Sequence, residues 1–171
     1  GLPAPRLEGG AYDAFLDRFV AAVRTVCPGA LVQWEDFGAS NARRVLDAYR
    51  HQLPSFNDDI QGTSGVATAA ILAGLRGLGK NLADQRFVIF GAGTAGCGIA
   101  ERLLRLLQRE GLDAAEAADR LWLLNRHGLV HEDMAGLGAM VKPYAKSRER
   151  LAALRGGVDA GGGAMTGGGF V

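Results

Sequence analysis

The sequence predicts an α/β fold: a partial Rossmann-type parallel sheet with flanking helices and a disordered, glycine-rich C-terminal tail. Three short apolar runs, at residues 31–34, 87–90 and 121–124, have the length and composition of strands. The stretches between them repeat their apolar residues at helical spacing. The middle run leads directly into a Gly-x-Gly-x-x-Gly sequence, which is typical of the first turn of a dinucleotide-binding domain.

The composition is that of a globular domain. A chain of 171 residues with 48% hydrophobic and 22% charged residues is long enough to bury a core. The formal net charge is +1 and no basic run occurs, so we expect no nucleic-acid partner. Because no signal peptide and no apolar run of about 20 residues appear, we expect a cytoplasmic protein without a membrane partner, in which Cys27 and Cys97 are reduced.

The first predicted strand ends in two carboxylates. From Ala11 to Cys27 the apolar residues recur at helical spacing, and Pro28-Gly29 ends that pattern. The run from Leu31 to Trp34 lacks the alternation of a half-exposed strand, so we expect it to be buried in a parallel sheet. Glu35 and Asp36 then lie at its C-terminal end, where open α/β sheets bind their ligands.

A helix and a second acidic pair follow. Ser40 can cap the helix, and Asp58 and Asp59 precede a further helix that Thr63 or Ser64 opens. Small residues are expected on the inner face of this second helix, because they allow a close approach of neighbouring backbone. The predicted buried residues of the first helix are Ala42, Val45, Leu46 and Tyr49, and the small inner residues of the second are Gly65, Ala67, Ala69, Ala70, Ala73 and Gly74.

The two acidic pairs predict a divalent metal site. Glu35 and Asp36 follow one strand, and Asp59 stands 23 residues after Asp36, behind the next apolar segment. Carboxylates held close together repel one another and raise each other's pKa unless a cation joins them. Oxygen ligands of this kind suit Mg²⁺ or Mn²⁺. The simpler alternative is that Asp58 and Asp59 form only a turn and a helix cap.

The glycine-rich turn is predicted to bind the pyrophosphate of a dinucleotide. Gly91 permits a tight turn, Gly93 lets the pyrophosphate approach the backbone, and Gly96 lets the following helix lie close to the strand. That helix, from about Thr94 to Glu110, directs its free N–H groups at the pyrophosphate. The predicted cofactor-binding residues of this turn are Gly91, Ala92, Gly93, Thr94, Ala95 and Gly96.

The end of the next predicted strand bears on the choice between NAD and NADP. Asp113 and Glu116 have the spacing of a capping box for a short helix that precedes this strand. A carboxylate at the strand's end is expected for NAD, but this chain has Asn125 followed by Arg126. Asn125 can bind a ribose hydroxyl without repelling a 2′-phosphate, and Arg126 can pair with one, so both cofactors remain candidates.

We divide the chain into three parts. Residues 1–62 are assigned to the end of a substrate and metal domain, residues 63–131 to the start of a dinucleotide-binding domain, and residues 132–171 to a poorly defined tail. Residues 145–154 could form a helix, whereas residues 156–171 are half glycine and are expected to be disordered. A complete dinucleotide fold needs further strands, and none is convincing in this tail.

Three motifs taken together resemble those of malic enzymes, the oxidative decarboxylases that convert malate to pyruvate and carbon dioxide. They are Gln33-Trp34-Glu35-Asp36-Phe37, Phe56-Asn57-Asp58-Asp59-Ile60-Gln61-Gly62-Thr63 and Phe90-Gly91-Ala92-Gly93, in the family's order, within a resemblance that covers about residues 12–130. The resemblance implies that Glu35, Asp36 and Asp59 are the protein ligands of the metal, with Asp59 also near the cofactor. It implies that Asp58 supports the family's catalytic lysine.

The resemblance also implies that part of the catalytic machinery lies elsewhere. The family's lysine base, tyrosine acid and substrate-binding arginine precede the first acidic motif by more residues than this chain contains, and the first ten residues look like the interior of a longer chain. We therefore expect a fragment that does not turn over malate alone. The intact enzyme is expected to use malate, NAD or NADP, and Mg²⁺ or Mn²⁺, and to form a homo-oligomer. Two other hypotheses are a non-catalytic remnant that binds dinucleotide or metal, and another Rossmann dehydrogenase, such as an amino-acid or folate dehydrogenase.

Overall fold

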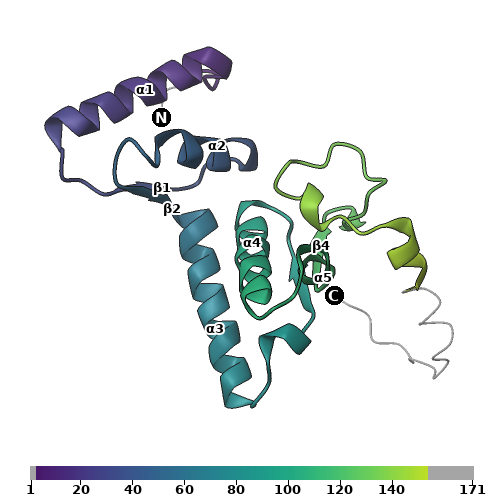
Figure 1. The fold of residues 1–171 in the computed structure, drawn as a ribbon. Coiled ribbons are helices and arrows are strands. Elements are labelled where there is room, and N and C mark those ends of the chain that lie inside the picture. The colour runs from purple at the N-terminus through teal and green to yellow at the C-terminus, as the bar shows by residue number, and fades with distance from the viewer. Residues whose placement is uncertain (1–2, 154–171) are drawn as a thin grey trace.

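The computed structural model describes residues 3–153 and has a mixed α/β architecture with two small sheets (Figure 1). The predicted disordered tail at residues 156–171 lies outside the described residues. The elements in chain order are α1 (Gly9–Val26), β1 (Val32–Trp34), α2 (Ala39–Tyr49), β2 (Ser55–Asn57), the π-helical turn η1 (Asp58–Gly62), α3 (Thr63–Gly77), the 3₁₀ turn η2 (Leu82–Asp84), β3 (Phe87–Phe90), α4 (Thr94–Arg109), α5 (Ala114–Asp119), β4 (Leu121–Asn125), β5 (Gly128–Leu129) and the 3₁₀ turn η3 (Lys142–Tyr144).

The first sheet pairs β1 with β2 in parallel and packs against α1 and α2. Its register aligns Val32 with Ser55 and Trp34 with Asn57. The predicted buried stripe of α2 is confirmed, and its residues form one apolar core with Trp34 and with Leu16 and Val20 of α1. The expectation of a fully buried first strand was wrong: Leu31 is 66% exposed, because the sheet has only two strands and cannot cover it on both sides. Gly38, rather than Ser40, is the N-cap of α2.

The second sheet contains the strands that flank the predicted dinucleotide turn. β3 and β4 are parallel, as predicted, with Phe87 opposite Leu121 and Phe90 opposite Leu124. β5 is antiparallel to β4 and follows it through a tight turn. The face of β3 that carries Val88 and Phe90 is bare, because these side chains are 71% and 91% exposed. Apolar residues of α4, α5 and β4 form the second core, with Leu103, Leu107, Ala117, Leu121, Leu123 and Val130 at its centre.

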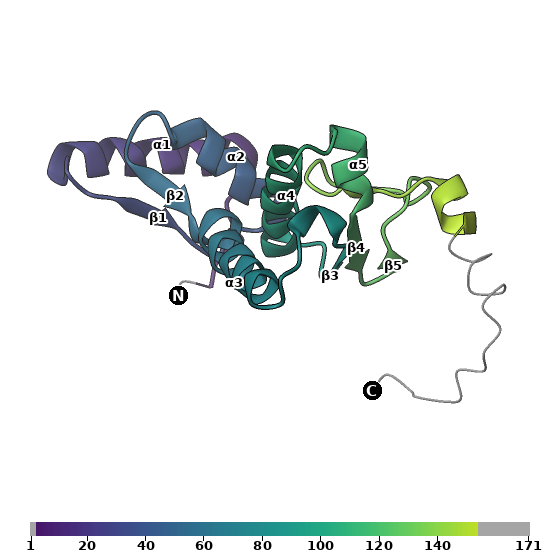
Figure 2. The same ribbon diagram turned by 60° about the horizontal axis from the view of Figure 1, so that its bottom comes forward.

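Helices α3 and α4 lie side by side between the two sheets (Figures 1 and 2). The prediction that α3 buries its small residues was wrong for four of them, which are exposed: Ala69, Ala70, Ala73 and Gly74. The buried residues of α3 are instead Ser64 and Thr68, whose hydroxyls donate to carbonyl oxygens of the preceding turn. Further along α3 the side chains that pack on the second core are larger and half-buried, namely Ile71 and Leu75.

A further sequence expectation is confirmed by the described residues. Asp113 accepts a hydrogen bond from the backbone N–H of Glu116 at 2.8 Å, and the Glu116 carboxylate accepts one from Asp113 at 3.0 Å, so α5 begins with a capping box. Within residues 3–153, the helices are all too short or too polar to cross a bilayer.

Buried hydroxyl and thiol groups should make the protein sensitive to alkaline pH. Burial raises the pKa of Tyr49 and of Tyr144 to about 12, with hydrogen bonding to Asp17 adding to the effect at Tyr49. Burial also raises the pKa of Cys97 to about 11. Because the folded state holds these protons more tightly, the stabilisation is complete below the ordinary pKa values of about 9–10 and is lost as pH rises through 11–12.

We therefore expect the free energy of unfolding, measured by urea denaturation, to fall as the pH rises from about 9 to about 12. A Tyr49→Phe/Tyr144→Phe variant cannot ionise at these positions, so its stability should decline less over the same range. An identical decline in the variant and the wild type would contradict this assignment.

Candidate functional site

The structure brings the two predicted acidic motifs together at one edge of the first sheet. Glu35 and Asp36 follow β1, and Asp59 lies in η1, directly behind β2. Because the two strands are parallel, their carboxyl ends meet at the same edge. One carboxylate oxygen of each residue lies within 4.8 Å of those of the other two. Glu35 and Asp36 are exposed to solvent and Asp59 is half-buried, so the cluster opens outward.

Asp36 has an unusual backbone conformation that fixes this cluster. Its φ is +58°, and it is the one residue other than glycine with a positive φ between residues 3 and 153. Asp tolerates this left-handed conformation better than most residues do, although it still carries strain. In this conformation the Asp36 N–H donates to the Asp59 carboxylate at 3.0 Å. Gln33 holds the third member, donating from its side-chain amide to the Glu35 carboxylate at 2.6 Å.

The backbone strain at Asp36 leads to a stability prediction. Both Asp36→Gly and Asp36→Ala remove the carboxylate and keep the backbone N–H that Asp59 accepts from. Only glycine adopts a φ of +58° without steric cost, and that cost is about 1 kcal/mol or more for alanine. We expect the glycine variant to be more stable than the alanine variant by about 1 kcal/mol in urea unfolding. Equal stability of the two variants would show that this conformation is not maintained in solution.

The turn that carries Asp58 and Asp59 is held in place by hydrogen bonds of the preceding residue, Asn57. Asn57 is fully buried and caps η1, since its side-chain oxygen accepts from the Ile60 N–H at 2.9 Å. Its own N–H donates to the Gln61 side chain at 3.0 Å. A Cβ at Gly62 would lie 2.0 Å from the Asp58 carboxylate, so glycine is needed there for Asp58 to lie over the turn. Asp58 is half-buried and stays outside the three-carboxylate cluster.

The acidic cluster fits a hard divalent cation. Its three donors are carboxylate oxygens, which Mg²⁺ and Mn²⁺ prefer. Oxygen ligands of one octahedral Mg²⁺ lie about 3 Å apart when adjacent and about 4.2 Å apart when opposite, and the three oxygens here lie within 4.8 Å of one another. None of the three carboxylates forms an ion pair with a basic side chain within residues 3–153. A cation at this position would therefore relieve their repulsion and need little movement of the side chains.

The glycine-rich turn has the geometry that dinucleotide binding requires. Gly91 has a φ of +124°, and its N–H and that of Ala92 both donate to the carbonyl oxygen of Leu124, at 2.9 and 2.8 Å. A Cβ at Gly96 would lie only 1.9 Å from the carbonyl oxygen of Gly91, so only glycine lets α4 approach β3 this closely. Gly93 is the N-cap of α4, and Thr94 and Ala95 form its first turn.

One pocket is lined both by the glycine-rich turn and by residues at the end of β4. It has a volume of about 730 Å³ and is lined by Gly91, Ala92 and Gly93 on one side and by Asn125 and Arg126 on the other. The Asn125 side-chain oxygen accepts from the His127 N–H at 2.8 Å, and its amide nitrogen faces the Met134 sulfur at 3.8 Å. The Arg126 guanidinium donates to the His127 ring at 3.0 Å. The structure thus brings five of the nine predicted cofactor-binding residues into one pocket. Of the other four, Thr94, Ala95 and Gly96 lie in the adjoining helix, and Asp59 lies in η1, outside the lining of this pocket.

One wall of this pocket, formed by a loop after β5, was not predicted from the sequence. The loop from Met134 to Val141 covers it with small and apolar residues, although these were assigned to a poorly defined tail. Gly136 has a φ of +70°, and the closely spaced glycines Gly136 and Gly138 were the available signal for a built loop. Cys97 beside the turn is buried, and burial raises its pKa to about 11, as is typical of a packed thiol rather than a nucleophile.

A second close approach joins the acidic turn to the dinucleotide turn. A Cβ at Gly98 of α4 would lie 2.6 Å from the carbonyl oxygen of Ile60, which follows Asp59 directly. Gly96, one half-turn earlier in α4, makes the corresponding approach to Gly91. The N-terminal turn of α4 therefore contacts both η1 and the glycine-rich turn, and it fixes the two candidate sites relative to each other.

Comparisons with known proteins agree with this geometry. The family model described as the NAD-binding domain of malic enzyme matches residues 60–160, and that of the malic enzyme N-terminal domain matches residues 1–50. NAD-dependent malic enzyme 3 of Bacillus subtilis is 47% identical over 157 residues, which are 92% of this chain and 28% of the relative. The malolactic enzyme of Leuconostoc mesenteroides is 43% identical over 146 residues, which are 85% of this chain and 27% of the relative.

A solved structure supports the same relationship. The crystal structure of an NAD-dependent malic enzyme from Thermotoga maritima superposes with a TM-score of 0.58 at 25% identity, covering 79% of this chain and 35% of that one. The chain thus spans about a quarter of the length of the two relatives described above. The match of the NAD-binding model over more than half of the residues rules out the alternative of an unrelated Rossmann dehydrogenase. This chain belongs to the malic enzyme family.

Proposed function

We propose that this chain is the part of an NAD-dependent, decarboxylating malate oxidoreductase that holds the divalent metal and the pyrophosphate of the cofactor. The proposal assigns Glu35, Asp36 and Asp59 to Mg²⁺ or Mn²⁺, and the turn from Gly91 to Gly96 to the dinucleotide. Malate would be oxidised and decarboxylated to pyruvate and carbon dioxide. One observation carries this proposal: the three carboxylates converge on a turn that packs directly against the helix of the dinucleotide-binding motif.

The cation would supply Lewis acidity toward the hydroxyl of malate and toward the ketone carbonyl that lies beta to the departing carboxylate. The chain's own residues provide position and charge. The hydrogen bond from Asp36 to Asp59 holds two of the ligands in a fixed relation before binding. The free N–H groups at the start of α4 favour an anionic pyrophosphate at Gly93. Asp58 is proposed to orient the catalytic lysine that the family resemblance places in a part of the enzyme outside this sequence.

NAD is the proposed cofactor, with NADP as the alternative. The B. subtilis and T. maritima relatives are both named as NAD-dependent. Arg126 lines the cofactor pocket and is exposed, so it is available to a 2′-phosphate. Fluorescence titration of the wild type and of an Arg126→Gln variant with NADH and with NADPH decides between them. If NADP is the true cofactor, the variant should bind NADPH more weakly than the wild type does and bind NADH equally well.

The direct test of the proposed activity is a chimaera. The segment of the B. subtilis relative that aligns with residues 12–130 of this chain is replaced by those residues, and malate-dependent reduction of NAD is measured with Mn²⁺. We expect turnover in the chimaera and its loss in the same chimaera carrying Asp59→Asn. A chimaera that binds NADH but does not turn over malate would favour the alternative of a non-catalytic dinucleotide-binding protein.

The isolated chain offers a complementary test. We expect it to bind NADH and Mn²⁺ but not to oxidise malate, because its sequence contains no match to the family's motifs for the lysine base and the tyrosine acid. Malate turnover that depends on Asp59 in these 171 residues would contradict the expectation that the base lies elsewhere.

A further inference from the structure

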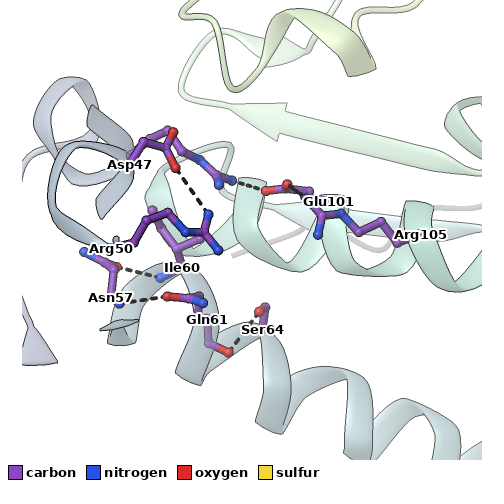
Figure 3. Close-up of polar contacts among 9 residues, drawn as sticks. Asp47, Arg50, Asn57, Ile60, Gln61, Ser64, Glu101 and Arg105 are labelled. Atoms are coloured by element: carbon purple, nitrogen blue, oxygen red, sulfur yellow. Dashed lines mark hydrogen bonds and ion pairs between the residues drawn. The ribbon is translucent and has the colours of Figure 1, made fainter. Parts of the chain in front are cut away.

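A second pocket, distinct from the two candidate sites above, lies between α2, η1 and α4. Its volume is about 270 Å³. Ile60, Gln61 and Ser64 line it, and Gly98 at its base lets α4 approach η1 closely. Figure 3 shows Glu101 and Arg105 of α4 on one side of this region and Arg50, at the end of α2, on the other. None of the predicted metal-binding or dinucleotide-binding residues lines this pocket.

The lining is strongly basic. Five arginines line the pocket, two from the region of α2 and three from α4, namely Arg43, Arg50, Arg102, Arg105 and Arg109. Glu101 pairs with both Arg43 and Arg105, and Asp47 pairs with Arg50. Five guanidinium groups facing two carboxylates leave a net charge of +3. Two of the five, Arg102 and Arg109, have no acidic partner within residues 3–153.

Folding alone does not account for this arrangement. Residues 102, 105 and 109 recur at the three- and four-residue spacing that places side chains on one face of a helix. That face meets Arg43 and Arg50 across a small volume, where like charges repel. The Arg102 guanidinium also lies against the start of α3, 3.9 Å from the position that a Cβ of Gly65 would occupy. Arg102, Arg105 and Arg109 are exposed to solvent, so water and salt moderate this repulsion and the guanidinium groups are accessible to a dissolved anion.

The pocket also offers a neutral hydrogen-bond donor, the side-chain amide of Gln61. The side-chain oxygen of Gln61 is used by the Asn57 N–H, while its amide nitrogen makes no hydrogen bond to another described residue. The planar fork of arginine binds phosphate and carboxylate groups through two parallel hydrogen bonds. The pocket's volume of about 270 Å³ is well below the volume of about 730 Å³ of the pocket at the glycine-rich turn, which suits a small anion and not a dinucleotide.

We propose that this arginine-lined pocket binds a small multivalent anion whose charge is carried by phosphate or carboxylate groups. Arg102 and Arg109 supply the charge that no internal carboxylate neutralises, and Gln61 adds a neutral donor. The site is separate from the proposed catalytic function, since neither malate nor NAD is needed for it. Bound here, an anion would contact Ile60 and Gln61, the two residues that follow Asp59 in the acidic turn.

The test is isothermal titration calorimetry on the full chain, with inorganic pyrophosphate as the phosphate probe and tricarballylate as the carboxylate probe. We expect saturable binding of at least one probe, and a loss of affinity of about tenfold or more in an Arg102→Gln/Arg109→Gln variant. The matched control is Arg76→Gln, which changes an exposed arginine of α3 outside the pocket and should leave the affinity unchanged. The arm that binds more tightly identifies the anion class.

Three results would overturn the proposal. The first is that neither probe binds the wild type. The second is equal pyrophosphate affinity in the wild type and the double variant, which would place that anion at the glycine-rich turn instead. The third is a double variant that melts well below the wild type without ligand, because removing unpaired like charges should leave the melting temperature equal or higher. A single Arg109→Gln variant, with an expected smaller loss of affinity, provides the same comparison with less change to the protein.

Discussion

Asp59→Asn is expected to weaken Mn²⁺ binding by at least about 100-fold, which corresponds to about 2.7 kcal/mol. Asp59 is the half-buried member of the acidic cluster and the acceptor of the Asp36 N–H. The substitution removes a charge and leaves the shape of the side chain, so the hydrogen bond that orders the cluster can persist. The loss of affinity would therefore report on the ligand charge itself. Calorimetric titration of MnCl₂ into the wild type and the variant measures it.

The matched control is Asp84→Asn, which removes a charge from an exposed aspartate at the end of η2, far in sequence from the cluster. Its Mn²⁺ affinity should equal that of the wild type. If Asp59→Asn and Asp84→Asn bind Mn²⁺ equally well, the three carboxylates are not a metal site, and the turn-and-cap interpretation of Asp58 and Asp59 is correct.

Gly96→Ala is expected to destabilise the fold by about 2–3 kcal/mol and to abolish measurable NADH binding. The new methyl group would lie 1.9 Å from the Gly91 carbonyl oxygen and 3.2 Å from the Ile89 side chain. Because the first of these is backbone, the helix must move away from β3 to accept it. That movement would displace the N–H groups that face the pyrophosphate. Urea unfolding measures the first effect, and NADH fluorescence measures the second.

Gly93→Ala separates binding from stability at the same turn. Gly93 has a φ of −90°, and a Cβ there would meet nothing within 4 Å, so the folded protein should tolerate alanine at little cost. A dinucleotide whose pyrophosphate lies against this backbone would meet the methyl group. We expect nearly unchanged unfolding but weaker NADH binding. If Gly93→Ala binds NADH as the wild type does, the pyrophosphate does not lie against Gly93.

The elements that the sequence predicted well are those with a local signal. The strand at Phe87–Phe90, the glycine turn and the capping box at Asp113 each depend on residues close together in the chain, and the structure has all three. The convergence of Glu35 with Asp59 was also predictable, because carboxyl ends of parallel strands must meet at one edge. The metal itself, the domain boundaries and the roles of individual site residues remain predictions.

Other features depend on contacts that no local pattern carries. The exposure of Ala69 and Ala73 follows from which side of α3 meets α4, a choice that a helix rich in small apolar residues leaves open. The arginine-lined pocket requires α2 and α4 to face each other, although Arg50 and Arg102 are 52 residues apart in the chain. The π-helical geometry of Asp58–Gly62 likewise depends on a buried Asn57, whose side-chain oxygen accepts from the Ile60 N–H and whose backbone N–H donates to the Gln61 side chain.

The bare face of β3 has a consequence for how this polypeptide behaves at high concentration. Val88 and Phe90 project into water from a strand that has a neighbour on one side only within residues 3–153. The other side presents unsatisfied N–H and C=O groups beside an aromatic ring, a combination that templates intermolecular strand addition. Self-association through this edge, visible as a sedimentation coefficient that rises with protein concentration, should be suppressed by Phe90→Lys.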